Sequence, residues 1–91
     1  MAGYVKLCRI LGKGDFRRGR ELLDAVAERM DHARKKHPVF AECPEDAVAV
    51  IGEEYAELVH AVRWETSERL HDEGLDLAVT ALRLVNGEHE V

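Results

Sequence analysis

The chain has 91 residues, of which 46% are hydrophobic and 34% are charged, with five aromatic side chains. This length suits one domain rather than two, since domains usually run to about 100 to 150 residues. The composition is too apolar for a disordered chain and too poor in glycine and proline for a fibrous one. The net charge of -5 argues against binding to DNA or RNA strands, whose phosphates attract basic proteins.

No segment of the sequence suggests a membrane span or a secretory signal. Uncharged stretches such as Ala47–Gly52 are far shorter than the roughly 18 apolar residues that a span requires, and the amino terminus lacks a secretory hydrophobic segment. We therefore expect a cytoplasmic protein that does not bind membranes. Cys8 and Cys43 lack CxxC spacing, so they predict two buried thiols rather than a disulfide framework or a zinc ribbon.

An irregular amino-terminal segment, residues 1–18, is expected to precede the first helix. Within it, Tyr4–Leu11 suits either a strand or a helical turn, and Leu11–Asp15 suggests a flexible joint. The Gly12-Lys13-Gly14 stretch lacks the spacing of a phosphate-binding P-loop, so we do not expect it to bind a nucleotide.

Residues 19–37 form the first predicted helix. Apolar residues recur at steps of three and four from Leu22 to Ala33, with charged residues between them, as in a helix with one buried face. Its last turn is basic, which complements the negative carboxyl end of a helix, and Pro38 ends it.

Two more helices are predicted after Pro44, which is followed by two acids in the manner of a helix start. No later proline interrupts the pattern, but a single helix of that length would be unusual in a small domain. The capping residues Thr66 and Ser67 divide it into helices over 44–64 and 67–85. The expected fold class is all-α, a short helical bundle. Because the last helix is apolar almost all round, we expect homo-oligomerisation, as a homodimer or homotetramer, to complete the bundle.

Acidic residues occupy positions on these two helices where packing alone would favour leucine. Glu54 falls in the middle of an apolar helix face, and Glu57 follows one turn later at its edge. Burying a carboxylate that has no partner is unfavourable by roughly several kcal/mol. Glu54 therefore requires a cation or a proton. Glu73 similarly interrupts a leucine seam on the last helix, with Asp76 one turn later. The leucines of that seam are Leu70, Leu77 and Leu84.

Antiparallel pairing of the two helices about position 65 places Glu54 level with Asp76 and Glu57 level with Glu73. Carboxylates in one layer raise one another's pKa, and a hard divalent cation would offset their repulsion. All-oxygen ligation favours Mg²⁺ or Mn²⁺ over zinc, and Mg²⁺ usually retains positions for water and substrate phosphates. Solvated surface charge would explain either acidic pair alone, but two pairs at matching heights favour a metal site.

The stretches Gly52–Leu58 (GEEYAEL) and Glu73–Asp76 (EGLD) resemble the EExxE...ExxD signature of the MazG-like all-alpha nucleoside triphosphate pyrophosphohydrolases. The resemblance covers the last two helices clearly, the first helix by pattern only, and residues 1–18 not at all. It implies hydrolysis of a nucleoside triphosphate to the monophosphate and pyrophosphate. It also implies a nucleotide pocket near a subunit interface.

The same resemblance assigns roles to the acids. Glu53 would support the metal or orient the attacking water. The Mg²⁺ ligands would be Glu54, Glu57, Glu73 and Asp76.

Substrate phosphates also require cations. Arg83 is the favoured candidate because it shares a helix with two of the acids, and Lys36 and Trp64 are further candidates for contact with phosphate and base. Simple surface charge is the commoner explanation for each of these cations, and core packing is the commoner explanation for the tryptophan. Weaker candidates of the same kinds are Lys35, Arg63 and Tyr55.

Three alternative functions remain open. One is phosphoribosyl-ATP pyrophosphohydrolase, whose second motif is typically followed by a more aromatic stretch than Leu77–Leu84. Another is a carboxylate-bridged di-iron protein, suggested by the ExxH pairs that end at His60 and His71. The second pair, however, points roughly 140° away from Glu73 and Asp76 around its helix. The third is a helical dimer that has kept the motif without activity.

Overall fold

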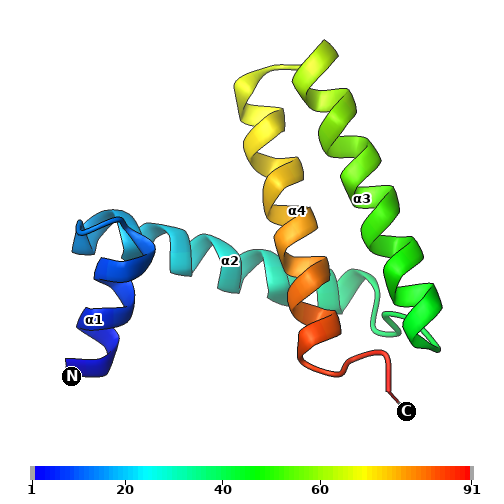
Figure 1. Cartoon of the computed structure of the whole chain (residues 1–91), viewed down its shortest axis with the longest axis horizontal. Helices are drawn as coiled ribbons and strands as arrows, with labels where there is room; N and C mark the ends of the chain where they lie inside the picture. Colours follow the sequence, from blue (N-terminus) through cyan, green and yellow to red (C-terminus); the bar gives the residue numbers. More distant parts are fainter. Residues whose placement is uncertain (1, 91) are drawn as a thin grey trace.

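The computed structural model describes residues 2–90, which form four helices and no strand (Figure 1). Helices α3 and α4 run antiparallel as a hairpin, α2 lies across α4, and α1 contacts α2 alone. The predicted all-α class is therefore confirmed. None of the helices within 2–90 is both long enough and apolar enough to cross a membrane. The helices are α1 (Ala2–Leu11), α2 (Phe16–Lys36), α3 (Pro44–Trp64) and α4 (Ser67–Val85).

The bounds of α3 and α4 coincide with the predicted helices over 44–64 and 67–85. Pro44 occupies the first position of α3, and two acids follow in its first turn, where negative charge stabilises the amino end of a helix. The side chain of Thr66 caps α4 by accepting a hydrogen bond from the backbone N–H of Arg69 at 3.3 Å. Local signals therefore determine where each of the two helices begins.

The expectation of an irregular segment over residues 1–18 is wrong, because α1 occupies Ala2–Leu11. This helix crosses α2 at very short range: a Cβ on Gly19 would lie 1.5 Å from the carbonyl oxygen of Cys8. Cys8 is fully buried at the crossing, and the rings of Tyr4 and Phe16 meet edge to face at 6.0 Å. Packing on α2 thus stabilises a short helix that its own ten residues would leave marginal.

The joint between α1 and α2 is a tight turn rather than a flexible one. Lys13 and Gly14 both have positive φ, 57° and 94°, and the N–H of Gly14 bonds back to the carbonyl of Arg9 at 2.7 Å. Asp15 caps the next helix by accepting a hydrogen bond from the N–H of Arg18, so α2 begins at Phe16, three residues earlier than predicted.

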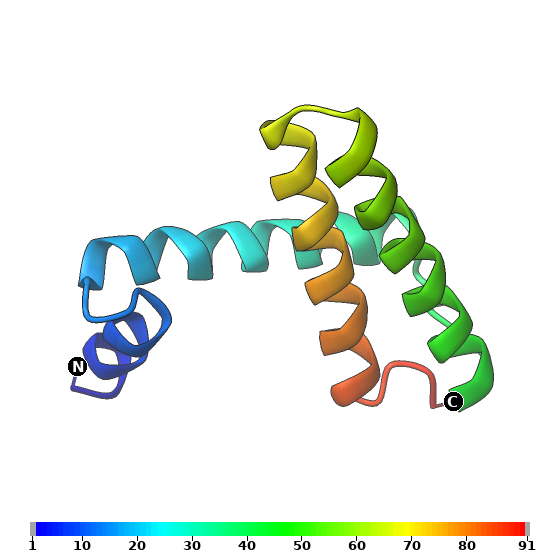
Figure 2. The ribbon, with the colours of Figure 1, turned by 45° about the horizontal axis from the view of Figure 1, so that its top comes forward.

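The core is small and lies where the loop after α2 meets the α3–α4 hairpin. Val79 is the largest fully buried side chain of residues 2–90, followed by Cys8, while Leu70 of the predicted leucine seam is 38% exposed. The radius of gyration is 14.5 Å, against about 12 Å for a compact chain of this length. The arm formed by α1 and the start of α2 extends away from the hairpin (Figure 2) and accounts for this open shape. The other core residues are Phe40, Ala41, Ala47, Val50 and Leu84.

Candidate metal centre

Three carboxylates from the two antiparallel helices converge at one point. Glu54 and Glu57 extend from α3 and Glu73 from α4, and one oxygen of each lies within 4.8 Å of the others. This convergence follows from the pairing of the helices, because residues one turn apart on α3 share a face. The prediction that Glu57 and Glu73 lie at the same level of the hairpin agrees with this short distance between their oxygens.

The innermost carboxylate of the cluster is Glu73, which is only 4% exposed. One of its oxygens accepts a hydrogen bond from the guanidinium of Arg69, one turn earlier on α4. Its other oxygen, Oε2, is buried and has no hydrogen-bond partner, and the same holds for Oε2 of Glu54. Two buried acceptors without partners are unfavourable in a protein interior, so the cluster has unused capacity to bind a cation.

The protonation of the cluster reflects this environment. Burial, followed by the negative charges of Glu57, Asp76 and Glu73, raises the pKa of Glu54 to about 7. Burial also raises the pKa of Glu73, which the guanidinium of Arg69 partly opposes. A proton or a cation is therefore needed to stabilise the cluster near neutral pH.

Asp76, the fourth acid of the motif, lies beside the cluster but has a partner of its own. Its Oδ1 accepts a hydrogen bond from Arg29 of α2 at 3.1 Å, and the same guanidinium donates to Asp72 at 3.2 Å. The charge of Asp76 nevertheless reaches the cluster, since it raises the pKa of Glu54. The structure thus brings three of the four predicted ligands together and ties the fourth to α2.

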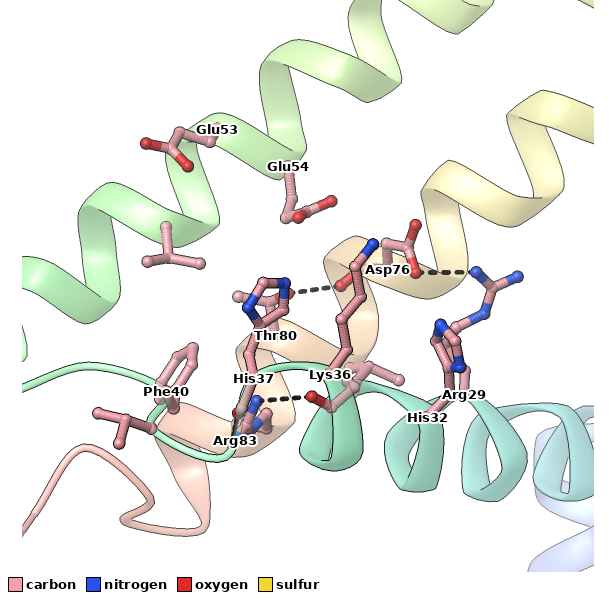
Figure 3. Close-up of a pocket in the computed structure, with 14 residues that line it drawn as sticks. Arg29, His32, Lys36, His37, Phe40, Glu53, Glu54, Asp76, Thr80 and Arg83 are labelled. Atoms are coloured by element: carbon pink, nitrogen blue, oxygen red, sulfur yellow. Dashed lines mark hydrogen bonds and ion pairs between the residues drawn. The ribbon is translucent and has the colours of Figure 1, made fainter.

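A cleft of about 320 Å³ opens next to the acids, between α2, α3 and α4. Figure 3 shows Glu54 and Asp76 along one side, with Lys36 and His32 extending from α2 opposite them. Glu53 lies farther out on α3, at the edge of the cleft. The far end is apolar, so the cleft combines an acidic side, a basic side and an apolar floor. The apolar lining consists of Val39, Phe40, Val50 and Val79.

Arg83 also borders the cleft, but its donors are already used. It is 4% exposed, and its guanidinium lies over the ring of Phe40 at 4.9 Å. It donates to Glu88 at 2.9 Å and to the backbone carbonyl of His37 at 3.0 Å. The expectation of a substrate-binding Arg83 is therefore corrected: the residue joins the end of α2 to the end of α4.

The remaining candidates divide between cleft and surface. Lys36 lines the cleft, whereas Trp64 is 76% exposed at the end of α3 and does not reach it. Tyr55 is likewise 60% exposed, on the outside of α3. Sequence reasoning missed Arg29, Arg69 and His32. Arg29 and His32 border the cleft from α2, so their neighbours lie on another helix, and the role of Arg69 depends on which face of α4 is buried. Lys35 and Arg63 are exposed and line no part of the cleft.

The thiols differ from one another. Cys8 is buried as expected, but Cys43 is only half-buried, and both are free. Neither belongs to the carboxylate cluster.

The donor set of the cluster suits a hard divalent cation. All its candidate ligand atoms are carboxylate oxygens, two of them without other partners, and Mg²⁺ and Mn²⁺ prefer oxygen ligands. Such a cation would replace the missing hydrogen bonds and offset the repulsion that raises the pKa of Glu54. Comparison with models of protein families, with curated proteins and with solved structures found no match to the chain.

Proposed function

We propose that this protein is a Mg²⁺-dependent nucleotide pyrophosphohydrolase, which hydrolyses a nucleoside triphosphate to the monophosphate and pyrophosphate. The observation that carries the proposal is the buried, unpartnered oxygen of Glu73 facing the carboxylates of Glu54 and Glu57 beside a cleft. A packed helical hairpin has no structural use for such an arrangement, which is unfavourable without a cation. The resemblance of both acidic motifs to the MazG-like enzymes supports the same conclusion.

In this proposal Glu54, Glu57 and Glu73 hold the ion, and Asp76 contributes the oxygen that Arg29 does not bind. The ion, when bound, supplies positive charge to the phosphates and acidity to water. Mn²⁺ is expected to substitute, because it accepts the same ligands.

Other side chains of the cleft bind and orient the substrate. Glu53 is exposed at the cleft edge, where its carboxylate can accept a proton from the attacking water. Lys36 and His32 line the basic side, where the phosphates would bind. The apolar floor around Phe40 and Val50 would hold the base and the sugar away from water.

The composition of the cluster favours magnesium over iron. A di-iron site of this type uses histidines together with carboxylates, but the cluster contains no histidine among the residues that the structure describes. His60 instead lies 3.7 Å from Glu65 at the far end of the hairpin, and His71 is exposed. We therefore rank the di-iron alternative below nucleotide hydrolysis.

The test is a pyrophosphate-release assay across ribo-, deoxyribo- and modified nucleotides, with phosphoribosyl-ATP included, in the presence and absence of Mg²⁺. We expect Mg²⁺-dependent release of pyrophosphate, and a loss of about a hundredfold in the Glu73→Gln variant, because even residues that only support a metal ligand typically contribute about 10- to 100-fold. Glu68→Gln is the matched control, since Glu68 is an exposed acid on the same helix.

Two outcomes would count against the proposal. Equal turnover in Glu73→Gln and in the control would exclude the cluster from catalysis. A protein that Mg²⁺ neither activates nor stabilises against heating would instead be the non-catalytic helical dimer. Release from phosphoribosyl-ATP alone would identify the narrower enzyme.

A further inference from the structure

Glu73, the innermost acid of the cluster, has one oxygen in use and one free. Its Oε1 accepts a hydrogen bond from the guanidinium of Arg69, whereas its Oε2 is buried and has no hydrogen-bond partner among residues 2–90. The side chain of Arg69 is half exposed and that of Glu73 is almost fully buried, so the guanidinium reaches the cluster from the solvent side. While this bond is in place, Glu73 can offer a cation a single oxygen.

Arg69 occupies a position that does not favour the stability of α4. Thr66 is the N-cap, so Arg69 is the third residue of the helix, where a capping box places Glu or Gln and where the helix dipole disfavours a cation. An arginine four residues before a glutamate is also the less favourable order for an ion pair along a helix. The pair of Arg69 with Glu73 is therefore better explained by the cluster than by the helix.

Glu65, the residue that follows α3, holds the same guanidinium at a second point. Its Oε2 accepts a hydrogen bond from Nε of Arg69 at 3.4 Å, while the hydrogen bond to Glu73 comes from Nη2. A planar guanidinium held by two carboxylates has a fixed orientation. Because the contact with Glu65 lies outside the cluster, it remains available to Arg69 whether or not the cluster holds an ion.

Calcium and magnesium ions differ in how they use a carboxylate. Ca²⁺ takes about six to eight oxygens, and a carboxylate can supply both of its oxygens to one ion. Mg²⁺ is smaller, requires a near-ideal octahedral set of ligands and usually retains several waters, and Mn²⁺ shares its preference for six oxygens. A carboxylate limited to one oxygen therefore suits Mg²⁺ and Mn²⁺, but it withholds a ligand atom that Ca²⁺ would use.

We propose that Arg69 makes the cluster select Mg²⁺ and Mn²⁺ against Ca²⁺, by occupying Oε1 of Glu73 and leaving only Oε2 as a ligand. Glu65 keeps the guanidinium in place from outside the cluster. Arg69 is a positioning residue in this inference, because it acts on the ion through Glu73. The inference rests on the ion site of the proposed function and adds to it a preference among divalent cations.

Ion binding, measured without any activity, tests the proposal. Mn²⁺ is titrated into the full chain at constant pH, electron paramagnetic resonance measures the free ion, and Ca²⁺ or Mg²⁺ then competes for the site. The selectivity is the dissociation constant of Ca²⁺ divided by that of Mg²⁺. In Arg69→Met, which keeps most of the side-chain length but none of its donors, this ratio should fall about tenfold, since residues that support a metal ligand typically contribute about 10- to 100-fold.

Three further variants separate this effect from changes of fold or net charge. Arg63→Met removes an exposed arginine of α3 and should leave the ratio within about twofold of the wild type, as expected for a screened surface charge. Arg69→Lys keeps a cationic donor within reach of Glu73 and should retain most of the selectivity. Glu65→Gln leaves the cluster intact but weakens the second contact of the guanidinium, so the ratio should fall by about threefold. Far-UV circular dichroism establishes that each variant is folded.

Three results would overturn the inference. One is a folded Arg69→Met variant that binds all three ions more weakly but with an unchanged ratio, which is what a purely structural role predicts. Another is a ratio that stays at the wild-type value in Glu65→Gln. The third is a wild type that binds Ca²⁺ as tightly as Mg²⁺. A wild type that binds none of these ions would remove the ion site of the proposed function as well, whereas normal binding with an unchanged ratio would remove this inference alone.

Discussion

Replacement of Glu54 by glutamine should stabilise the protein in metal-free buffer, although it removes a side chain of the proposed site. The pKa of Glu54 is raised to about 7 from its ordinary value of 4.5, mainly by burial and then by its acidic neighbours. A raised pKa means that the folded protein binds the proton more tightly than the unfolded chain does. The wild type must therefore lose stability as the pH rises from about 4.5 through 7.

The size of the effect follows from that difference in pKa. At about 1.4 kcal/mol per pH unit, the repulsion and burial amount to no more than about 3.5 kcal/mol. Glu54 is only partly buried, so solvent screening reduces this to about 1 to 2 kcal/mol. For a domain of this size, the Glu54→Gln variant should then melt about 5 to 10 °C above the wild type at pH 8.

Thermal unfolding followed by circular dichroism, at fixed protein concentration with a chelator present, measures this directly. The melting temperature of the variant should decline less than that of the wild type between pH 5 and 8, the remaining decline coming from Glu73, whose pKa burial also raises. Saturating Mg²⁺ should reverse the order by stabilising the wild type more than the variant. Glu68→Gln, a change of one exposed acid on α4, controls for net charge. A variant that melts below the wild type at pH 8, or a wild type whose stability does not change over this range, would refute the reasoning.

Two further predictions concern regions outside the cluster. Gly19→Ala should destabilise the chain by about 2 to 3 kcal/mol in urea titrations, because the new methyl group would overlap the carbonyl of Cys8. The control is Gly3→Ala, where a Cβ meets open space and which should be neutral or slightly stabilising. Equal effects of the two substitutions would argue against the close crossing of α1 and α2. The hydrogen bond from Arg34, followed by those from Asn86 and Arg83, lowers the pKa of Glu88 to about 2. A lowered pKa stabilises the fold above about pH 5 and loses that contribution as the pH falls toward 2, by about 1 to 2 kcal/mol after screening. Glu88→Gln should remove this acid-dependent loss from unfolding curves, and an unchanged acid limb would exclude the contact.

The helices of the hairpin were predictable because their ends are encoded locally. Pro44 begins α3 and Thr66 caps α4 through contacts with residues a few positions away. The pairing of the acids followed from the same information, because two helices joined by a tight turn have a fixed register. Glu57 and Glu73 therefore meet as their numbering predicts.

The rest of the fold depends on contacts that are distant in the sequence. Helix α1 is short, and Gly19, the glycine that lets α1 cross α2 closely, belongs to α2. The residues of α1 alone therefore do not predict that this segment is a helix. On α4 the seven-residue spacing favours Leu70, Leu77 and Leu84 as the buried seam, but the buried apolar residues are Leu75 and Val79, and Leu70 is exposed. The sequence shows that Arg83 shares a helix with Glu73 and Asp76, but it does not show that Arg83 is buried against the end of α2. Nor does it show that Arg29 reaches Asp76 across 47 positions.

Helix α2 runs without interruption from its crossing with α1 to the cleft, over 21 residues, and behaves mechanically as a single rod about 30 Å long. Phe16 and Gly19 in its first turn pack on α1, while Arg29 and Lys36 near its other end border the cleft. A tilt of about 5° imposed where the rod begins moves its far end by about 2.5 Å, enough to break the hydrogen bond from Arg29 to Asp76. The position of α1 and the shape of the cleft are therefore coupled through one continuous helix.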